Sequence, residues 1–245
     1  MYPHIKILDV RVKISKTNLM KNTKQLENRE TFVARLRKFT KDQAEIDEIM
    51  FAYDMAKEAH RTANRDSGER YFEHPRATAL IMLDELKWFD KNSLIAMLLH
   101  DVGEDTPILG NVIKDYDEFI RTAKFRLGKT FNPEVAELVI LLTKPSVDGK
   151  RFTNKAATAD FYIKQLVKNP KALLLKMVDR LHNLRSLKTS TVEKTEKILK
   201  ETIDVYLPIF EKLTSKKSNF GLKAEKLLKL IEEKVKSLPN VNSRN

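Results

Sequence analysis

The sequence contains no cysteine, and only 6 glycines and 8 prolines occur among its 245 residues. The absence of cysteine excludes a disulfide framework, a cysteine nucleophile, an iron–sulfur cluster and a cysteine-ligated zinc site. Any metal must therefore be bound by histidine, aspartate and glutamate. The small number of turn-forming residues argues against a sandwich or barrel of many short strands, and against a collagen-like or low-complexity chain.

Long hydrophobic runs are also missing. No stretch approaches about 18 uninterrupted apolar residues, so the sequence predicts no transmembrane helix. Residues 1–22 lack the apolar core of about 7–15 residues that a secretory signal needs. Because 42% of the residues are hydrophobic and 33% are charged, the composition is that of a globular protein. We therefore expect a cytoplasmic enzyme or binding protein that does not associate with a membrane.

Positive charge is abundant but unevenly placed. The chain carries a net charge of +12, and this excess lies wholly in its two flanks. Residues 1–40 contain 10 basic and 3 acidic side chains and residues 186–245 contain 13 and 8, whereas residues 41–185 contain 23 of each. A uniformly basic nucleic-acid-binding protein would not show this distribution, so nucleic acid is not an expected partner. Two interpretations stay open, namely solvated helix faces and attraction of polyanions such as RNA or an anionic substrate.

Apolar residues recur at helical spacing through most of the chain. Residues 5–14 alternate loosely, which fits one short strand or an arm, and the polar, lysine-rich residues 15–28 predict a linker. From Arg29 onward the pattern is helical, with neither a repeat nor a βαβ alternation. The predicted fold class is all-α, a compact multi-helix bundle with a basic N-terminal extension and amphipathic C-terminal helices. The predicted divisions are an extension over 1–40, a helical domain over 41–213, and a C-terminal helix with a tail over 214–245.

The expected helices follow from this spacing and from local start and stop signals. Pro75 and Pro170 suit the first turn of a helix, where the missing N–H costs nothing. Asn92 or Ser93 is expected to cap a strongly apolar helix, and residues 145–151 predict a loop. The expected helices cover residues 42–64, 75–86, 94–100, 118–127, 133–143, 158–167, 170–187, 192–213 and 222–237.

Three places put polar residues inside or beside apolar runs. His100 and Asp101 end the run that precedes them, and Asp179 lies on the apolar face of another helix. His74 directly precedes Pro75, at the start of a third helix. Burial of a bare carboxylate costs several kcal/mol unless the group is paired or bound to a metal. These four residues therefore need an explanation.

Each of these four residues, taken alone, has an ordinary structural explanation. A buried aspartate often caps a helix or meets an arginine, and Arg180 or Arg185 could pair with Asp179, while a single histidine before proline is usually structural. Together, however, two imidazoles and two carboxylates on three helices suit a divalent metal that prefers nitrogen and oxygen ligands, such as Mn, Fe, Co or Zn. Such an ion can polarise a phosphoryl oxygen and activate water.

Four longer motifs lie in the same part of the chain, within residues 42–213. They are HRTANRDSGERYFEHP (60–75), HDVGEDT (100–106), DRLHNLR (179–185) and KETIDVYLP (200–208). With them the chain resembles the HD superfamily of metal-dependent phosphohydrolases, and within it the hydrolase domain of the bifunctional guanosine tetraphosphate synthetase/hydrolases. Because too little sequence follows Leu213 for a synthetase domain, we expect a stand-alone small alarmone hydrolase.

The resemblance implies a role for each matching residue. The family's metal, usually Mn²⁺, is bound by four residues, which here match His74, His100, Asp101 and Asp179. Glu104 and Asp105 match the acidic pair that holds and deprotonates the attacking water. Asn183 lies four positions after Asp179 on the same helix face, where a neutral amide can orient a metal-bound water or a ligand without adding charge. His60 and His182 match no ligand position and are interpreted as structural.

The resemblance also implies a substrate pocket. Its matching residues are Arg65, which stacks on the base, and Tyr71, Arg185, Ser186 and Tyr206, which line or support the pocket. The chain departs from the family at two places, because Asp66 stands where lysine is common and Arg70 stands where proline is common. An acid beside a polyphosphate is unfavourable unless Arg70 compensates, so Arg70 is a further candidate for substrate binding. These departures leave the base and phosphate preference open.

The function implied by the resemblance is Mn²⁺-dependent hydrolysis of guanosine 3′,5′-bis(diphosphate) and its pentaphosphate at the 3′-diphosphate. The products are pyrophosphate and GDP or GTP. One alternative is the same chemistry on another nucleotide phosphate, such as an adenosine analogue. A second alternative is a nucleotide-binding regulator with a spent active site. The expected partner is a small nucleotide, and the oligomeric state is left open.

Overall fold

Helices form the regular structure of the chain. The computed structural model describes residues 27–110, 115–214 and 220–238. Within these ranges there is no β-strand, and an isolated antiparallel bridge pairs Asn64 with Arg70. The predicted all-α class is confirmed. The strand or arm predicted at 5–14, and nearly all of the linker predicted at 15–28, lie outside the described residues.

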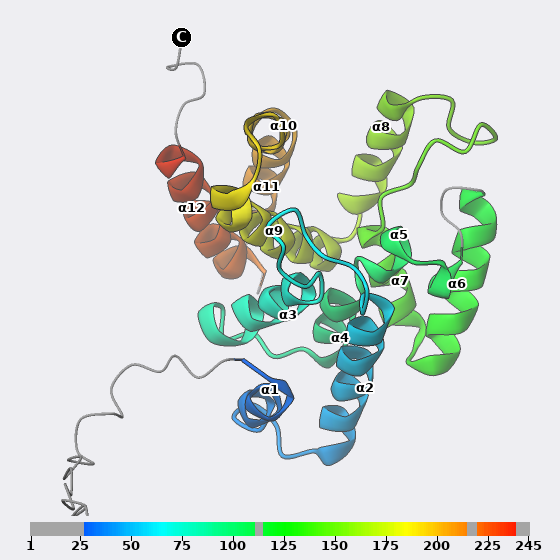
Figure 1. The fold of residues 1–245 in the computed structure, drawn as a ribbon, viewed down its shortest axis with the longest axis vertical. Helices are drawn as coiled ribbons and strands as arrows, with labels where there is room; N and C mark the ends of the chain where they lie inside the picture. Colours follow the sequence, from blue (N-terminus) through cyan, green and yellow to red (C-terminus); the bar gives the residue numbers. More distant parts are fainter. Residues whose placement is uncertain (1–26, 111–114, 215–219, 239–245) are drawn as a thin grey trace, which may run out of the picture.

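The order of the elements is close to the sequence prediction (Figure 1). The α-helices are α1 (Arg29–Leu36), α2 (Gln43–Ala59), α3 (Glu73–Leu80), α4 (Lys91–Leu99), α5 (Val102–Asp105), α6 (Tyr116–Thr130), α7 (Pro133–Leu142), α8 (Lys155–Leu166), α9 (Pro170–Arg185), α10 (Val192–Glu201), α11 (Leu207–Thr214) and α12 (Gly221–Ser237). Short 3₁₀ and π segments join some of them, namely η1 (Ile81–Glu85), η2 (Pro107–Leu109), η3 (Ser186–Thr189) and η4 (Thr202–Tyr206). Every expected helix from residue 42 onward has a counterpart.

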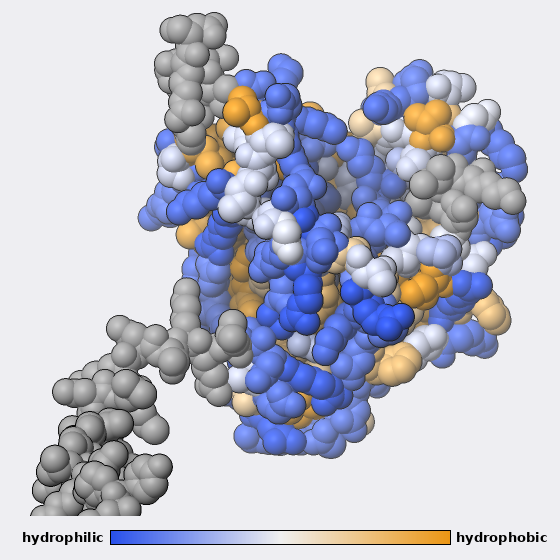
Figure 2. All heavy atoms as spheres, viewed as in Figure 1, coloured by the Kyte–Doolittle hydropathy of each residue, from blue (hydrophilic) through white to orange (hydrophobic). Residues whose placement is uncertain are grey.

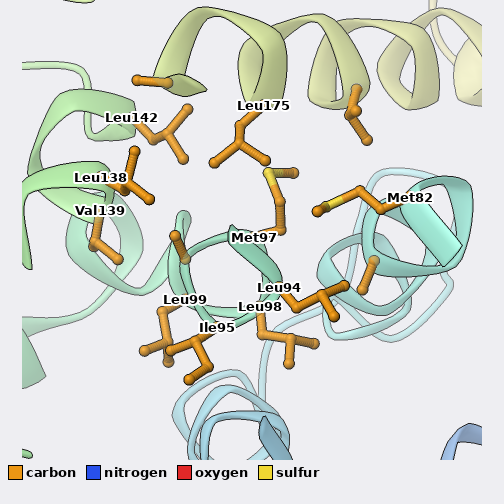
Figure 3. Close-up of a cluster of buried hydrophobic side chains, with 14 of the residues drawn as sticks. Met82, Leu94, Ile95, Met97, Leu98, Leu99, Leu138, Val139, Leu142 and Leu175 are labelled. Carbon is orange, nitrogen blue, oxygen red and sulfur yellow. The ribbon is translucent and has the colours of Figure 1, made fainter. Parts of the chain in front are cut away.

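Helix α4 is the centre of the hydrophobic core. Residues 94–99 are all fully buried, because this helix is apolar on every side and is surrounded by α2, α3, α7 and α9. Figure 3 shows its side chains directed outward toward residues of the neighbouring elements, among them Met82, Leu138, Val139, Leu142 and Leu175. Dense packing on all sides fixes the C-terminal end of α4, where His100 and Asp101 follow.

The start of α4 differs from the prediction. The sequence predicts a cap at Asn92 or Ser93, but the helix begins at Lys91 and its N-cap is Asp90. The Asp90 carboxylate accepts a hydrogen bond from the backbone N–H of Ser93 at 2.8 Å. Aspartate caps as well as asparagine or serine and adds a favourable interaction with the helix dipole, so the upstream acid is preferred. Ser93 is buried within the first turn instead.

A π-helical segment interrupts the long helix predicted over 192–213. The structure has α10, then η4, then α11 in this range. Pro208 gives the physical reason, since it has no N–H to donate and its ring would meet the carbonyl of Asp204 in a regular α-helix. Tyr206, at the end of η4, is buried and lines the cavity described below.

The C-terminal helix α12 packs onto α9, the helix that carries Asp179. It buries Ala224, Leu227 and Ile231 and contacts α9 and α11. The face of the molecule in Figure 2 is mainly hydrophilic, with small apolar patches between the polar residues. A search of the described residues finds no helix with the length and apolar character needed to cross a membrane.

Candidate metal centre and adjoining cavity

Four side chains with metal-binding atoms converge at the end of α4. The Nε2 atoms of His74 and His100 lie 3.2 Å apart. Asp101 Oδ2 lies 3.4 Å from His74 Nε2, and Asp101 Oδ1 lies 3.2 Å from His100 Nε2. Asp179 Oδ1, from α9, lies 3.1 Å from His74 Nε2 and 3.7 Å from His100 Nε2. Two atoms bound to one ion at about 2.0–2.3 Å lie at most about 4.6 Å apart. These separations fit one divalent cation, and His74, His100 and Asp101 form a group that can hold a metal ion.

The orientation of His100 is set by the backbone of its own helix. Its Nδ1 lies 2.7 Å from the carbonyl oxygen of Met97. Because a carbonyl oxygen only accepts, Nδ1 carries the hydrogen, so a neutral His100 imidazole would offer its lone pair at Nε2, which faces Asp101 and Asp179. The sequence reason is local, since His100 follows directly on the buried helix α4 and its ring folds back over the last turn.

His74 is held by a second histidine. Its Nδ1 lies 2.7 Å from Nδ1 of His182, whose ring is tilted against the His74 ring. Burial, followed by the neighbouring His74, lowers the pKa of His182 to about 3, so His182 is neutral. His60 is buried at a different place and stacks on Tyr71, with ring centroids 4.6 Å apart. Of these two non-ligand histidines, His182 therefore contacts the candidate ligands and His60 supports the wall beside them.

Asp179 is buried with a full set of polar partners. Its Oδ2 forms an ion pair with Lys176 Nζ at 2.7 Å, and its Oδ1 accepts a hydrogen bond from the Asn183 side chain at 2.7 Å. Burial alone would raise the pKa of this carboxyl, but Lys176 holds the pKa of Asp179 well below its usual range. All three residues lie on one face of α9, because they are three and four positions apart. Asp179 is therefore ionised and fixed toward the two imidazoles.

The acidic pair Glu104 and Asp105 lies on the short helix α5. Glu104 accepts a hydrogen bond from the backbone N–H of Lys144 at 2.5 Å, and burial raises the pKa of Glu104 to about 7. Burial also raises the pKa of Asp105. The Tyr71 hydroxyl donates to Asp101 Oδ2 at 3.2 Å, which links this corner to the candidate metal ligands. A carboxylate with a pKa near 7 is well suited to take a proton at neutral pH.

A cavity of about 300 Å³ lies beside these groups. Tyr71, Glu104, Asp179 and Asn183 line it on the side of the candidate metal centre. Five cationic side chains also line it, namely Arg65, Lys144, Lys176, Arg180 and Lys194. Four acidic side chains line it as well, namely Asp66, Glu104, Asp179 and Glu201, so the cations exceed the acids by one and the recess favours an anionic ligand.

Arg65 leaves part of its hydrogen-bonding capacity unused at the cavity wall. Its Nη2 donates to Asn183 Oδ1 at 3.1 Å and to Ser186 Oγ at 3.3 Å. Its Nη1 is buried and has no hydrogen-bond partner among the described residues. A buried donor without a partner is costly, so this nitrogen marks a place where a ligand acceptor would be stabilised.

The chain is similar to known proteins over most of its described length. A model of the HD domain matches residues 52–214. The chain belongs to the HD domain family. This HD domain is 35% identical over 173 residues to the bifunctional (p)ppGpp synthase/hydrolase SpoT of Escherichia coli K12. The aligned residues cover 69% of this chain and 22% of SpoT. It is 36% identical over 170 residues to the guanosine-3′,5′-bis(diphosphate) 3′-pyrophosphohydrolase of Aquifex aeolicus. This alignment covers 68% of this chain and 22% of the relative. The chain thus spans about a fifth of the length of these relatives.

A solved structure shows the same fold. It is described as a metazoan ortholog of SpoT that hydrolyses ppGpp and plays a role in starvation responses. The alignment covers 74% of this chain and 94% of the other, with a TM-score of 0.54 and 24% sequence identity. The helical arrangement of this HD domain is therefore shared with that protein.

The structure brings only some of the predicted substrate-binding residues to the cavity. Arg65, Tyr71 and Tyr206 line it, and Ser186 contacts Arg65. Two predicted residues have other partners. Arg70 is 65% exposed and pairs with Glu73 at 2.7 Å, and Arg185 pairs with Glu85 at 2.5 Å, so neither guanidinium lines the cavity.

Several cavity residues of the HD domain were not expected from the sequence. Lys176, rather than an arginine, is the cation that meets Asp179, while Arg180 meets Glu201 at 3.1 Å and lies 4.0 Å from the ring centroid of Tyr206. Lys176 could have been found, because it lies three positions before a buried acid on the same helix face. Glu201 could not have been found in this way, because its partner Arg180 lies on another helix.

Proposed function

We propose that this HD domain hydrolyses guanosine 3′,5′-bis(diphosphate), and the corresponding pentaphosphate, with the aid of Mn²⁺. Water adds its oxygen to the phosphorus that is bound to the 3′-oxygen, and the bond between that phosphorus and the 3′-oxygen breaks. The 3′-oxygen takes up a proton as it leaves. The products are pyrophosphate and GDP or GTP, depending on the 5′-phosphates.

The observation that carries the proposal is the convergence of two imidazole nitrogens with the carboxylates of two aspartates, within 3.1–3.7 Å in the pairs described, beside a cavity lined by cations. Mixed nitrogen and oxygen donors of this kind prefer Mn²⁺, Fe²⁺, Co²⁺ or Zn²⁺ to Ca²⁺ or Mg²⁺. The relatives indicate the substrate, since one of them is a guanosine-3′,5′-bis(diphosphate) 3′-pyrophosphohydrolase. The proposed ligands are His74, His100, Asp101 and Asp179.

When bound, the ion would polarise a phosphoryl oxygen and lower the pKa of water. The residues of the chain have distinct tasks around it. Glu104 and Asp105 take the proton of the attacking water. Burial raises the pKa of both carboxyls, which makes them better proton acceptors. Asn183 holds Asp179 Oδ1 by a hydrogen bond, and Tyr71 holds Asp101 Oδ2. These contacts keep the carboxylates in a fixed direction while charge develops on the phosphoryl group.

Arg65 is proposed to meet the nucleoside side of the substrate. Its buried Nη1 lacks a partner, and its planar guanidinium can stack on a base or donate to a phosphate. Tyr206 lines the same cavity behind Arg180, which covers its ring. These residues would orient the nucleotide so that the 3′-diphosphate faces the histidines.

The test is an assay of the purified chain with Mn²⁺ against guanosine 3′,5′-bis(diphosphate), its pentaphosphate and the adenosine counterparts. We expect equal amounts of pyrophosphate and GDP or GTP from the guanosine substrates. Asp179→Ala should remove this activity, whereas the matched control Asp204→Ala, an exposed acid on η4, should retain it. Turnover of the adenosine substrates alone would refute the guanosine assignment, and release of orthophosphate would refute cleavage at the 3′-oxygen. Absence of turnover with all of these substrates would refute the proposed activity.

A further inference from the structure

An ion pair bridges two walls of the cavity. Lys194 Nζ, on α10, lies 2.6 Å from Asp66 Oδ2, which belongs to the loop between α2 and α3. Both residues line the cavity. Their side chains are 39% and 60% exposed, so the pair is in contact with solvent. The two walls that it joins are separated by 128 positions in the sequence.

Two other cations of the cavity, Lys176 and Arg180, are held more firmly than Lys194, whereas Lys144 is about as exposed as Lys194. Lys176 is 12% exposed and is paired with the buried Asp179, and Arg180 is 6% exposed and is paired with Glu201. A solvent-exposed ion pair contributes only about 0–1 kcal/mol to stability, because water and salt screen it. The Lys194–Asp66 pair can therefore be opened at little cost, whereas removing Lys176 from Asp179 would leave a charge buried without a partner.

We infer that Asp66 occupies, on Lys194, the place of a substrate phosphate. When the nucleotide binds, a 5′-phosphate group replaces the Asp66 carboxylate, and Lys194 becomes a substrate-binding residue. The inference rests on the proposed function, which puts the 3′-diphosphate beside Asp179 and Glu104 and leaves the 5′ end for the solvent-exposed part of the same cavity.

The chemistry of the two anions favours this exchange. A phosphate group carries up to about twice the charge of a carboxylate and offers three acceptor oxygens, so it forms the stronger charge-assisted hydrogen bond with an ammonium group. Asp66 acts against binding in two ways, because it competes for Lys194 and because its own charge repels the substrate. Lys194 thus supplies the cation that Arg70 does not, since Arg70 is paired with Glu73 outside the cavity.

The test measures nucleotide binding by titration calorimetry in the presence of Mn²⁺. The protein is the full chain with the substitution Glu104→Gln, because slow hydrolysis would not obscure the heat of binding. The two ligands are guanosine 3′,5′-bis(diphosphate) and guanosine 3′-diphosphate with a free 5′-hydroxyl. The variants added to this background are Lys194→Ala, Asp66→Asn and the control Lys200→Ala. Lys200 suits as a control because it lies on the same helix, is 82% exposed and is paired with Asp204 outside the cavity.

We expect Lys194→Ala to raise the Kd of the bis(diphosphate) about 10-fold or more, the effect of losing a hydrogen bond between charged groups. The Kd of the 5′-hydroxyl nucleotide should change less than about 2-fold, and Lys200→Ala should change neither. Asp66→Asn should lower the Kd of the bis(diphosphate) a few-fold. An equal effect of Lys194→Ala on both ligands, no effect on either, or weaker binding in Asp66→Asn would overturn the inference.

Parallel assays of the chain with and without Lys194→Ala separate this inference from the proposed function. The expected binding pattern without any hydrolysis by the unsubstituted chain would refute the proposed function and leave the role of Lys194 intact. Hydrolysis with a KM that Lys194→Ala does not alter would refute the inference alone. Failure of the unsubstituted chain to bind either nucleotide would refute both.

Discussion

At the scale of single residues, His182 has a defined place next to a candidate metal ligand. For His74 to offer a lone pair at Nε2, its hydrogen must be on Nδ1, and the atom 2.7 Å away, Nδ1 of His182, must then accept that hydrogen. An acceptor at this position fixes both the tautomer and the direction of the His74 ring. His182 is thus a positioning residue, although the sequence alone indicates only a structural histidine.

Replacing His182 should therefore weaken metal binding. We expect His182→Phe to raise the Kd for Mn²⁺ about 10–100-fold, the usual effect of removing a partner of a ligating histidine. His182→Asn, which keeps an acceptor, should lose less. The matched control is His60→Phe, which preserves stacking on Tyr71 and should leave the Kd nearly unchanged. Titration of the metal-free variants with Mn²⁺ gives these constants, and an equal loss in His182→Phe and His60→Phe would contradict the assigned role.

The buried carboxyl of Glu104 links the site to stability. Its pKa is about 7 in the folded chain, against 4.5 for an ordinary glutamate, and burial is the main cause. Below about pH 4.5 the group is protonated in both the folded and the unfolded chain and has no effect. As the pH rises toward 7, the unfolded chain releases the proton and the folded chain does not, so stability falls and then stays lower above the folded pKa.

Glu104→Gln should remove this penalty in the metal-free protein. Gln keeps an oxygen for the Lys144 N–H, so we expect the free energy of unfolding to increase by about 3 kcal/mol at pH 8, since each pKa unit corresponds to about 1.4 kcal/mol. At pH 4.5 the gain should be small. Urea unfolding in a chelator at both pH values tests this, with Glu211→Gln on the exposed face of α11 as a control. A gain that is the same at both pH values would rule out burial of the charge as its cause.

At the scale of elements, α5 depends on a close approach that only glycine permits. This helix carries Glu104 and Asp105, and its Gly103 faces Thr143 at the end of α7. A Cβ added at Gly103 would lie 2.5 Å from Thr143 Oγ1 and 3.3 Å from Phe119. Thr143 cannot easily turn away, because it is fully buried and its hydroxyl donates to the Val139 carbonyl at 2.9 Å.

Gly103→Ala should therefore destabilise the protein by about 1–3 kcal/mol, the usual range for an overpacked core. The clash should also move α5 and reduce kcat. In the double variant Gly103→Ala, Thr143→Ala, the second substitution removes the clashing oxygen and should recover part of both losses. Thermal unfolding and kinetics of the single and double variants form a double-mutant cycle. Strictly additive losses would show that the two residues do not interact.

At the scale of the whole molecule, the charge of the cavity is set by the side chains that line it and not by the net charge of the chain. Arg65, Lys144, Lys176 and Arg180 all belong to the stretch from 41 to 185, which has no net charge. The basic excess of the flanks adds to it through Lys194, which α10 brings to the cavity. Exposed charges act over only about 8 Å at physiological ionic strength, so the nearby cations dominate binding. The net charge of +12 is therefore a poor guide to the site.

Much of the fold is predictable because its signals are local. The apolar spacing predicts the helices from residue 42 onward, since the helical period repeats over a few residues. The misplaced cap of α4 and the interruption by η4 have causes that are also local, in Asp90 and Pro208. Motif spacing likewise singles out His74, His100, Asp101 and Asp179 as a group, because buried polar residues are costly and their combination is rare in an apolar bundle.

The sequence by itself determined the helices, the all-α class, and the polar residues that apolar helices must bury. Only the tertiary structure decided which cations meet which acids. Arg180 pairs with Glu201, Arg185 with Glu85, and Lys194 with Asp66. The last two pairs join residues 100 or more positions apart, so their geometry depends on how helices pack and not on a local period. The assignment of Arg70 and Arg185 to substrate binding could not be tested on spacing alone, because a long side chain on a helix can reach several partners and packing selects among them.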